Sequence, residues 1–91
     1  IKNVKDDSIS ELKVDGMFVA IGIEPNNELV KGKLNLNESG FVITDENMNA
    51  GIPGVFAIGD LREKPVLQLV TAASDGAIGA IAAQRYIVEE F

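Results

Sequence analysis

The sequence contains no cysteine and no histidine. Without cysteine the chain can form no disulfide and offers no thiol for redox chemistry. Without either residue type, a zinc or other transition-metal site is not expected, and the usual proton shuttle of acid–base catalysis is missing. Any redox function of these residues must therefore depend on a cofactor, and no residue is assigned a catalytic role.

The chain is also poor in basic residues and in long apolar runs. The chain has eight Lys and Arg residues and 14 Asp and Glu residues, which gives a net charge of -6. This negative charge argues against nucleic acid or an anionic membrane as a partner. No run approaches the length of a membrane span, and no signal-peptide pattern opens the chain, so we expect a soluble, cytoplasmic protein. At 91 residues, starting at Ile1 within a strand-like pattern, the chain is expected to be a fragment.

Several short apolar segments with turn residues between them are present. Residues 1–5 and 9–14 alternate around a polar turn and predict a β-hairpin. Unbroken apolar runs at 17–21 and 41–44 predict short strands, and the run at 55–58 has the pattern of a fully buried parallel strand.

Two helical segments are expected. Residues 28–33 predict a single helical turn ended by Gly32, and residues 68–88 predict one long helix. Asp75 lies inside the long helix and is interpreted as a surface or interface residue. Strands joined to one C-terminal helix place the chain in the α/β class.

The long helix is unusually rich in small residues. Two of them are glycines, each of which costs about 1 kcal/mol relative to alanine in a helix interior, so another group is expected to approach the backbone closely. Tight packing against a sheet explains this composition, and so does packing of the first turns against a flat ligand. The small residues are Ala72, Ala73, Gly76, Ala77, Gly79, Ala80, Ala82 and Ala83.

Gly59 and Asp60 follow the apolar run at 55–58 directly. Ligands of open α/β sheets bind outside the carboxyl ends of strands, where a glycine followed by a carboxylate can meet a hydroxylated ligand. Such a pair also occurs in ordinary turns. The helix that begins after a linker of seven residues adds a second feature, because its first N–H groups lack intrahelical partners and favour negative charge.

Four segments together resemble the C-terminal part of the bacterial thioredoxin reductases, in the same order along the chain. They are VDGMFVAIGIEPN (14–26), GFV (40–42), PGVFAIGD (53–60) and the helix at 68–86. The resemblance covers nearly the whole chain. It implies a partial two-dinucleotide-binding-domain flavoprotein fold of β-strands and one long C-terminal helix, within a larger chain.

The resemblance also implies a division of the chain into domains. Residues 1–21 would be the C-terminal strands of the NADPH-binding domain, residues 22–26 the interdomain hinge, and residues 27–91 the C-terminal segment of the FAD-binding domain. The Gly-rich dinucleotide fingerprints and the redox Cys-x-x-Cys of the family lie upstream, outside these residues. The 91 residues alone are therefore expected to be inactive.

Four cofactor-binding residues follow from the resemblance. Asp60 would accept a hydrogen bond from a ribityl hydroxyl of FAD, beside Gly59, where the cofactor comes close to the backbone. Gln68 and Leu69 would offer backbone N–H groups to the N1 and C2-carbonyl edge of the flavin, where the helix dipole stabilises the negative charge of the reduced ring. The family usually has an arginine where this chain has Leu67.

The expected parent is an NADPH-dependent flavoenzyme that reduces thioredoxin or a similar redox protein and forms a homodimer. Two other interpretations remain open. The parent could be a ferredoxin–NADP reductase of the same architecture, which lacks the cysteine pair. The segment could also be a non-catalytic packing or interaction module.

Overall fold

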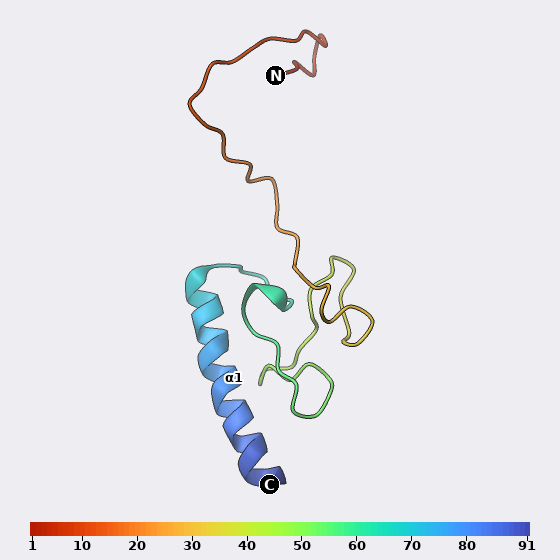
Figure 1. The fold of residues 1–91 in the computed structure, drawn as a ribbon, viewed down its shortest axis with the longest axis vertical. Coiled ribbons are helices and arrows are strands. Elements are labelled where there is room, and N and C mark those ends of the chain that lie inside the picture. The colour runs from red at the N-terminus through yellow and green to blue at the C-terminus, as the bar shows by residue number, and fades with distance from the viewer.

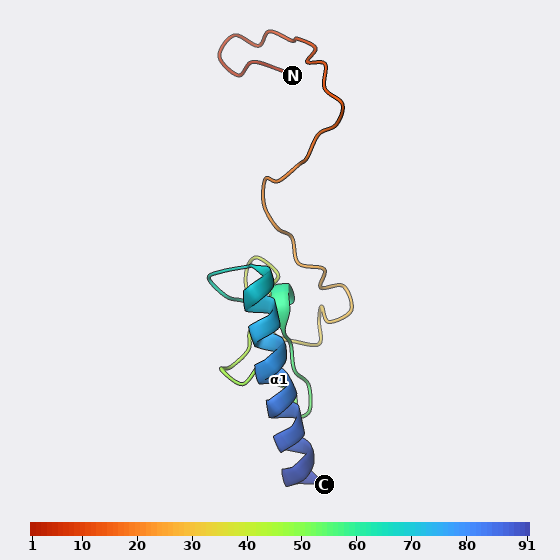
Figure 2. The same cartoon turned by 90° about the vertical axis from the view of Figure 1, so that its left-hand side faces the viewer.

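The computed structural model describes all 91 residues and contains two unlike parts (Figure 1). Residues 1–24 run away from the rest of the chain, whereas residues 25–91 are folded together beside the long helix (Figure 2). The molecule is accordingly elongated, with extents of 65 × 27 × 20 Å. All seven buried residues belong to the second part, which we call the compact region.

Only two regular elements form, the 3-10 helix η1 (Gly59–Leu61) and the α-helix α1 (Leu69–Glu90). The prediction of one long C-terminal helix is confirmed to within two residues at its end. Its first turn is fixed by Thr71, whose hydroxyl oxygen accepts the Gln68 N–H at 3.0 Å. None of the chain's helices has the length and hydropathy needed to cross a membrane.

The predicted hairpin at the N-terminus is confirmed over its first part only. Lys2 and Ile9 form an antiparallel bridge, and the Asn3 N–H donates to the Ser8 carbonyl oxygen at 2.8 Å. Beyond Ser10 the second arm has no partner. The hairpin is therefore a short terminal loop.

The prediction that residues 17–21 form a strand covered on both faces is wrong for this structure. Residues 17–21 make no backbone hydrogen bond and every side chain is exposed, with Phe18 fully open to solvent. The composition is that of a strand, but a strand needs a neighbour to take its N–H and C=O groups. No other segment of the chain lies beside it in either view (Figures 1 and 2).

The centre of the compact region is Val42, which is completely buried. Its N–H donates to the Leu61 carbonyl oxygen and its own carbonyl accepts the Glu63 N–H, both at 2.8 Å. It also bridges Leu36 in the antiparallel sense. The predicted strand at 41–44 is thus reduced to one doubly bridged residue, around which Met48, Ala50 and Ala57 are buried.

The prediction that residues 55–58 form a fully buried parallel strand is also wrong. Its single bridge is antiparallel and joins Phe56 to Asn49. Only Ala57 is buried, and Ile58 is 45% exposed. The segment is extended and leads into η1 as expected, but the chain contains no parallel neighbour that could cover it on both sides.

The small residues of α1 let neighbouring groups approach closely. A Cβ added to Gly79 would lie 2.7 Å from Ile58 Cγ2 and 3.7 Å from Met48 Cβ. This contact confirms close packing for that part of the helix, but the partner is an extended segment with one isolated bridge and not the expected sheet. The predicted turn at 28–33 is confirmed as well, with Gly32 in the left-handed region at φ +78°.

Candidate functional site

The Gly59–Asp60 pair forms the first turn of η1 and is presented at the surface of the compact region. Gly59 has φ +72°, a conformation that residues with a side chain rarely adopt. Asp60 is exposed, and its carboxylate accepts no hydrogen bond from within the chain. A carboxylate without a partner at an exposed turn can accept a hydrogen bond from a hydroxylated ligand.

A shallow hollow of about 220 Å³ lies beside Asp60. One wall is the segment predicted as the hinge, and the other is η1. The lining residues are Ile23, Glu24, Pro25, Asn26, Asp60 and Leu61. The structure thus places the predicted hinge next to the predicted ribityl contact, although the two are more than 30 residues apart in sequence.

The start of α1 lies close to the same turn. A Cβ added to Gly59 would be 3.8 Å from Ala72 Cβ, so the first turns of the helix pack against η1. The Gln68 N–H already donates to Thr71 Oγ1, whereas the Leu69 N–H has no acceptor within the chain. Of the two predicted backbone donors, Leu69 is therefore the one left free, at the positive end of the helix dipole.

Asp75 is not a surface or interface residue, contrary to the expectation. It is 3% exposed, and its carboxylate accepts hydrogen bonds from Arg62 Nε at 2.7 Å, Lys64 Nζ at 2.8 Å and the Gly59 N–H at 3.0 Å. The hydrogen bonds from Arg62, and those from Lys64 and Gly59, hold the pKa of the Asp75 carboxyl far below its usual range. Every buried side-chain nitrogen and oxygen atom of the chain has a hydrogen-bond partner.

The sequence contained a signal for this cluster. Asp75 is three residues after Ala72 and four before Gly79, which places it on the packed face of the helix. A carboxylate on a buried face requires cations, and the linker supplies Arg62 and Lys64. Because both cationic groups bind Asp75, neither is free to replace the arginine that the family usually has at the position of Leu67.

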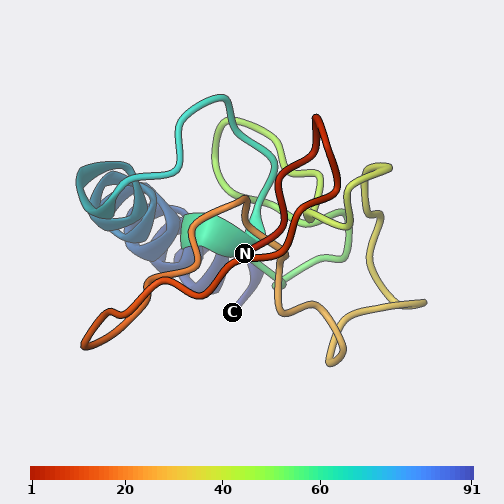
Figure 3. The ribbon, with the colours of Figure 1, turned by 90° about the horizontal axis from the view of Figure 1, so that it is seen from above.

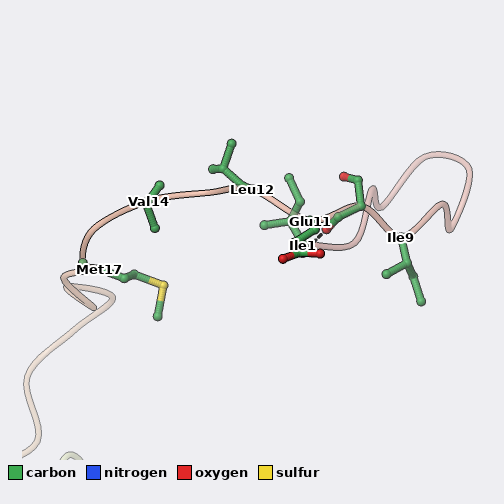
Figure 4. A pocket seen from close by; sticks show the side chains of 8 residues that line it. Ile1, Ile9, Glu11, Leu12, Val14 and Met17 are labelled. Atoms are coloured by element: carbon green, nitrogen blue, oxygen red, sulfur yellow. Dashed lines mark hydrogen bonds between the residues drawn. The ribbon is translucent and has the colours of Figure 1, made fainter.

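The largest hollow of the molecule lies elsewhere, at the N-terminal end, with a volume of about 490 Å³ (Figure 4). Its lining is mostly apolar and includes Ile1, Ile9, Leu12, Val14 and Met17. Figure 3 shows the N-terminal loop viewed along the long axis. No hydrogen bond or contact connects this hollow to the Gly59–Asp60 turn, and we assign it no role in the site.

The donor and acceptor set around Asp60 fits part of an FAD molecule. An unpaired carboxylate suits a ribityl hydroxyl, and a free helical N–H suits the electron-rich edge of the flavin. A glycine-rich phosphate-binding turn is not among these 91 residues. The groups present would therefore suit the ribityl and flavin part of such a cofactor, and the fingerprint that would hold its pyrophosphate is not among them.

Comparisons with known proteins show which family the chain resembles. The profile of the family described as pyridine nucleotide-disulphide oxidoreductase matches residues 1–77. A thioredoxin reductase of Peptoclostridium litorale is 53% identical over 76 residues, covering 84% of this chain and 24% of that protein. A 34.2 kDa protein in the rubredoxin operon of Clostridium pasteurianum is 52% identical over 87 residues, covering 96% and 28%.

Among solved structures, the thioredoxin reductase of Lactococcus lactis is 41% identical, with a TM-score of 0.80 over 97% of this chain and 29% of that one. The match takes in most of the extended N-terminal segment, so the open course of residues 1–24 has a counterpart in a larger protein. The chain spans about a quarter of the length of the relatives it matches. With a family profile over residues 1–77 and a shared fold over nearly its full length, the chain belongs to the pyridine nucleotide-disulphide oxidoreductase family.

Proposed function

We propose that the chain is the C-terminal segment of an FAD-dependent, NADPH-using thioredoxin reductase. Residues 1–21 would close the NADPH-binding domain, residues 22–26 would form the hinge, and residues 27–91 would complete the FAD-binding domain. The segment itself supplies contacts to the cofactor and no catalytic residue. A cytoplasmic location, a homodimer and thioredoxin as electron acceptor belong to the same proposal, and the thioredoxin reductases that the chain resembles support the last of these three.

The observation that carries the proposal is the exposed, unpaired Asp60 carboxylate beside Gly59 and the start of α1. When bound, FAD supplies the ring that accepts a hydride from NADPH and passes electrons to a disulfide. Asp60 would accept a hydrogen bond from a ribityl hydroxyl and fix the cofactor along the edge of the compact region. The Leu69 N–H would donate to the flavin edge, where the helix dipole favours negative charge.

The test uses the full-length enzyme with Asp60→Ala and Asp60→Asn. A charge-assisted hydrogen bond is worth about 1.5–3 kcal/mol, so Asp60→Ala should weaken FAD binding by roughly one to two orders of magnitude. Asp60→Asn keeps an acceptor oxygen and should weaken it less. FAD dissociation constants are measured by titration of the apoprotein, alongside apoprotein melting temperatures.

The same measurements can also contradict the cofactor role of Asp60. If Asp60 only stabilises the turn, both variants lower the melting temperature of the apoprotein and leave FAD affinity unchanged once folding is accounted for. Assays of the wild-type enzyme with thioredoxin and with ferredoxin as acceptors then separate the reductase from a ferredoxin–NADP reductase of similar architecture. Reduction of ferredoxin alone would overturn the proposed acceptor but not the cofactor role of Asp60.

A further inference from the structure

One buried carboxylate connects the two parts of the proposed flavin site. Asp75 Oδ2 accepts hydrogen bonds from the Gly59 N–H at 3.0 Å and from Lys64 Nζ at 2.8 Å. Arg62 donates through Nε to Oδ2 at 2.7 Å and through Nη2 to Oδ1 at 3.0 Å. The donors belong to η1 and to the linker, and the acceptor belongs to α1.

The burial of this cluster gives it a single geometry. The side chains of Asp75 and Lys64 are 5% and 4% exposed, and that of Arg62 is 19% exposed. Water is therefore largely excluded from the carboxylate, and a buried charge is tolerated only while its hydrogen-bonding partners are in place. The two-point contact of Arg62 also fixes the plane of the carboxylate.

Asp75 is one of the residues that anchor the linker between the two cofactor contacts, together with Val42, whose backbone is bonded to Leu61 and Glu63. Residues 61–67 join the Gly59–Asp60 turn to the start of α1, and the segment arches between them in Figure 1. Arg62 and Lys64 hold the linker to the helix, while the Gly59 N–H holds the turn itself. Asp75 thus ties both the turn and the linker to α1, and it contributes in this way to the distance between Asp60 and the Leu69 N–H.

We propose that Asp75 is a positioning residue for FAD, which aligns the ribityl acceptor at Asp60 with the free N–H at the start of α1. This inference rests on the proposed function. Asp75 is 3% exposed and bonded to the Gly59 N–H, so it would act through the turn and not by contact with the cofactor. A small displacement of one contact relative to the other lowers affinity because a rigid ligand can no longer reach both.

The chain offers a matched control for this carboxylate. Asp7 pairs with Lys2 at 3.3 Å, but its side chain is 80% exposed and it lies in the N-terminal loop, far from Asp60. Asp75→Asn and Asp7→Asn make the same chemical change in a buried and in an exposed ion pair. Only the first should affect the cofactor.

The experiment measures FAD dissociation constants and flavin reduction potentials of the full-length enzyme, with apoprotein melting recorded in parallel. Asp75→Asn should raise the dissociation constant about tenfold and Asp75→Ala more, because Asn keeps an acceptor for the Gly59 N–H. Asp7→Asn should leave it within twofold. A purely structural role would lower the melting temperature and leave both the affinity of the folded protein and the potential unchanged, which would overturn the proposal.

A second variant covers the case in which the Asp75 variants do not fold. Lys64→Met keeps the unbranched shape of the side chain, removes only its charged end, and does not touch the Arg62 and Gly59 donors to Asp75. It should raise the FAD dissociation constant about threefold, and an unchanged value would overturn the positioning role. If the wild-type enzyme binds no FAD, both the proposed function and the role of Asp75 are overturned. If the wild type and every variant bind FAD with the same affinity, only the role of Asp75 is overturned.

Discussion

Residues 1–24 and the compact region contain similar apolar side chains in very different surroundings. Phe18 and Ile21 are 101% and 95% exposed, whereas Val42 is completely buried. Hydrophobicity does not distinguish them. Val42 has backbone partners on both sides, and the segment from Glu11 to Asn26 makes no backbone hydrogen bond within the chain.

The comparison shows that burial in this fold depends on partners that are distant in sequence. The extended course of the N-terminal segment is matched in a solved thioredoxin reductase, of which this chain covers 29%. In a larger protein, other strands can cover a segment that is open here. An exposed apolar segment of this kind is therefore a surface that requires a partner.

The first prediction asks whether the compact region is a complete site. The 91-residue chain alone should bind FAD at least about a thousandfold more weakly than the full-length enzyme, because a few ribityl and flavin-edge contacts do not offset the cost of ordering the cofactor. Isothermal titration of both proteins gives the two constants. A submicromolar dissociation constant for the 91 residues alone would contradict the idea of an incomplete site.

The second prediction contrasts the ion pairs of the two regions. In the full-length protein, Asp75→Ala should lower the free energy of unfolding by about 3–5 kcal/mol, because it leaves two cations without their buried partner. The exposed Lys2–Asp7 pair should contribute no more than about 1 kcal/mol, so Asp7→Ala serves as control. Urea unfolding measures both, and equal effects would show that burial makes no difference to these pairs.

The pH dependence of the same variants follows from the lowered pKa of Asp75. A carboxylate with a depressed folded-state pKa stabilises the protein above its unfolded pKa of about 4, and this contribution is lost as the pH falls towards the folded value. The stability difference between wild type and Asp75→Asn should therefore be constant near neutral pH and shrink below about pH 4. Urea unfolding at several pH values checks this, and a difference that grows on acidification would contradict it.

The contrast between the regions also explains which features the sequence could predict. The helix at 68–88 and the turn ended by Gly32 depend on contacts within a few residues, and both were predicted correctly. The strand at 17–21 was not, because no other segment of this chain pairs with it. Short apolar runs indicate where a strand can form, but they do not say what will pair with it.

The site shows the same division. Gly59 and Asp60 could be selected from local sequence, and their cofactor role remains a prediction. Asp75 was misinterpreted because a charged residue in a helix is usually exposed. Its partners lie 11 to 16 residues earlier, and only the three-dimensional contact of the linker with α1 brings them together.

The third prediction compares the two regions by their accessibility to protease. Trypsin can cut after Lys13, in the unpaired segment, and after Arg85, inside α1. Cleavage after Lys13 should be at least about ten times faster, because cutting a helix requires local unfolding. Subtilisin should likewise cut at residues 22–26 before it cuts α1, and early cuts inside the helix with residues 22–26 intact would count against the proposed hinge.

Digestion of the full-length enzyme tests whether the N-terminal segment is covered there. If upstream strands cover residues 11–21 there, the Lys13 site should become resistant while residues 22–26 remain accessible. Mass spectrometry of timed digests identifies the cuts. Equal susceptibility of Lys13 in the two proteins would mean that the N-terminal segment stays open even in the complete chain.

The smallest effects are expected from two glycines of α1 that differ in their surroundings. A Cβ at Gly76 would lie 3.9 Å from Ile58 Cδ1, an ordinary contact, so Gly76→Ala should stabilise the full-length protein by up to about 1 kcal/mol through helix propensity. A Cβ at Gly79 would lie 2.7 Å from Ile58 Cγ2, on a side chain whose first torsion is stiff. Gly79→Ala should therefore destabilise by about 1–2 kcal/mol, since overpacking outweighs the gain in propensity. Urea unfolding of each variant, repeated with Ile58→Ala, isolates the contact: the penalty at Gly79 should disappear when Ile58 is truncated, and a penalty that persists would mean that the close packing of α1 has another cause.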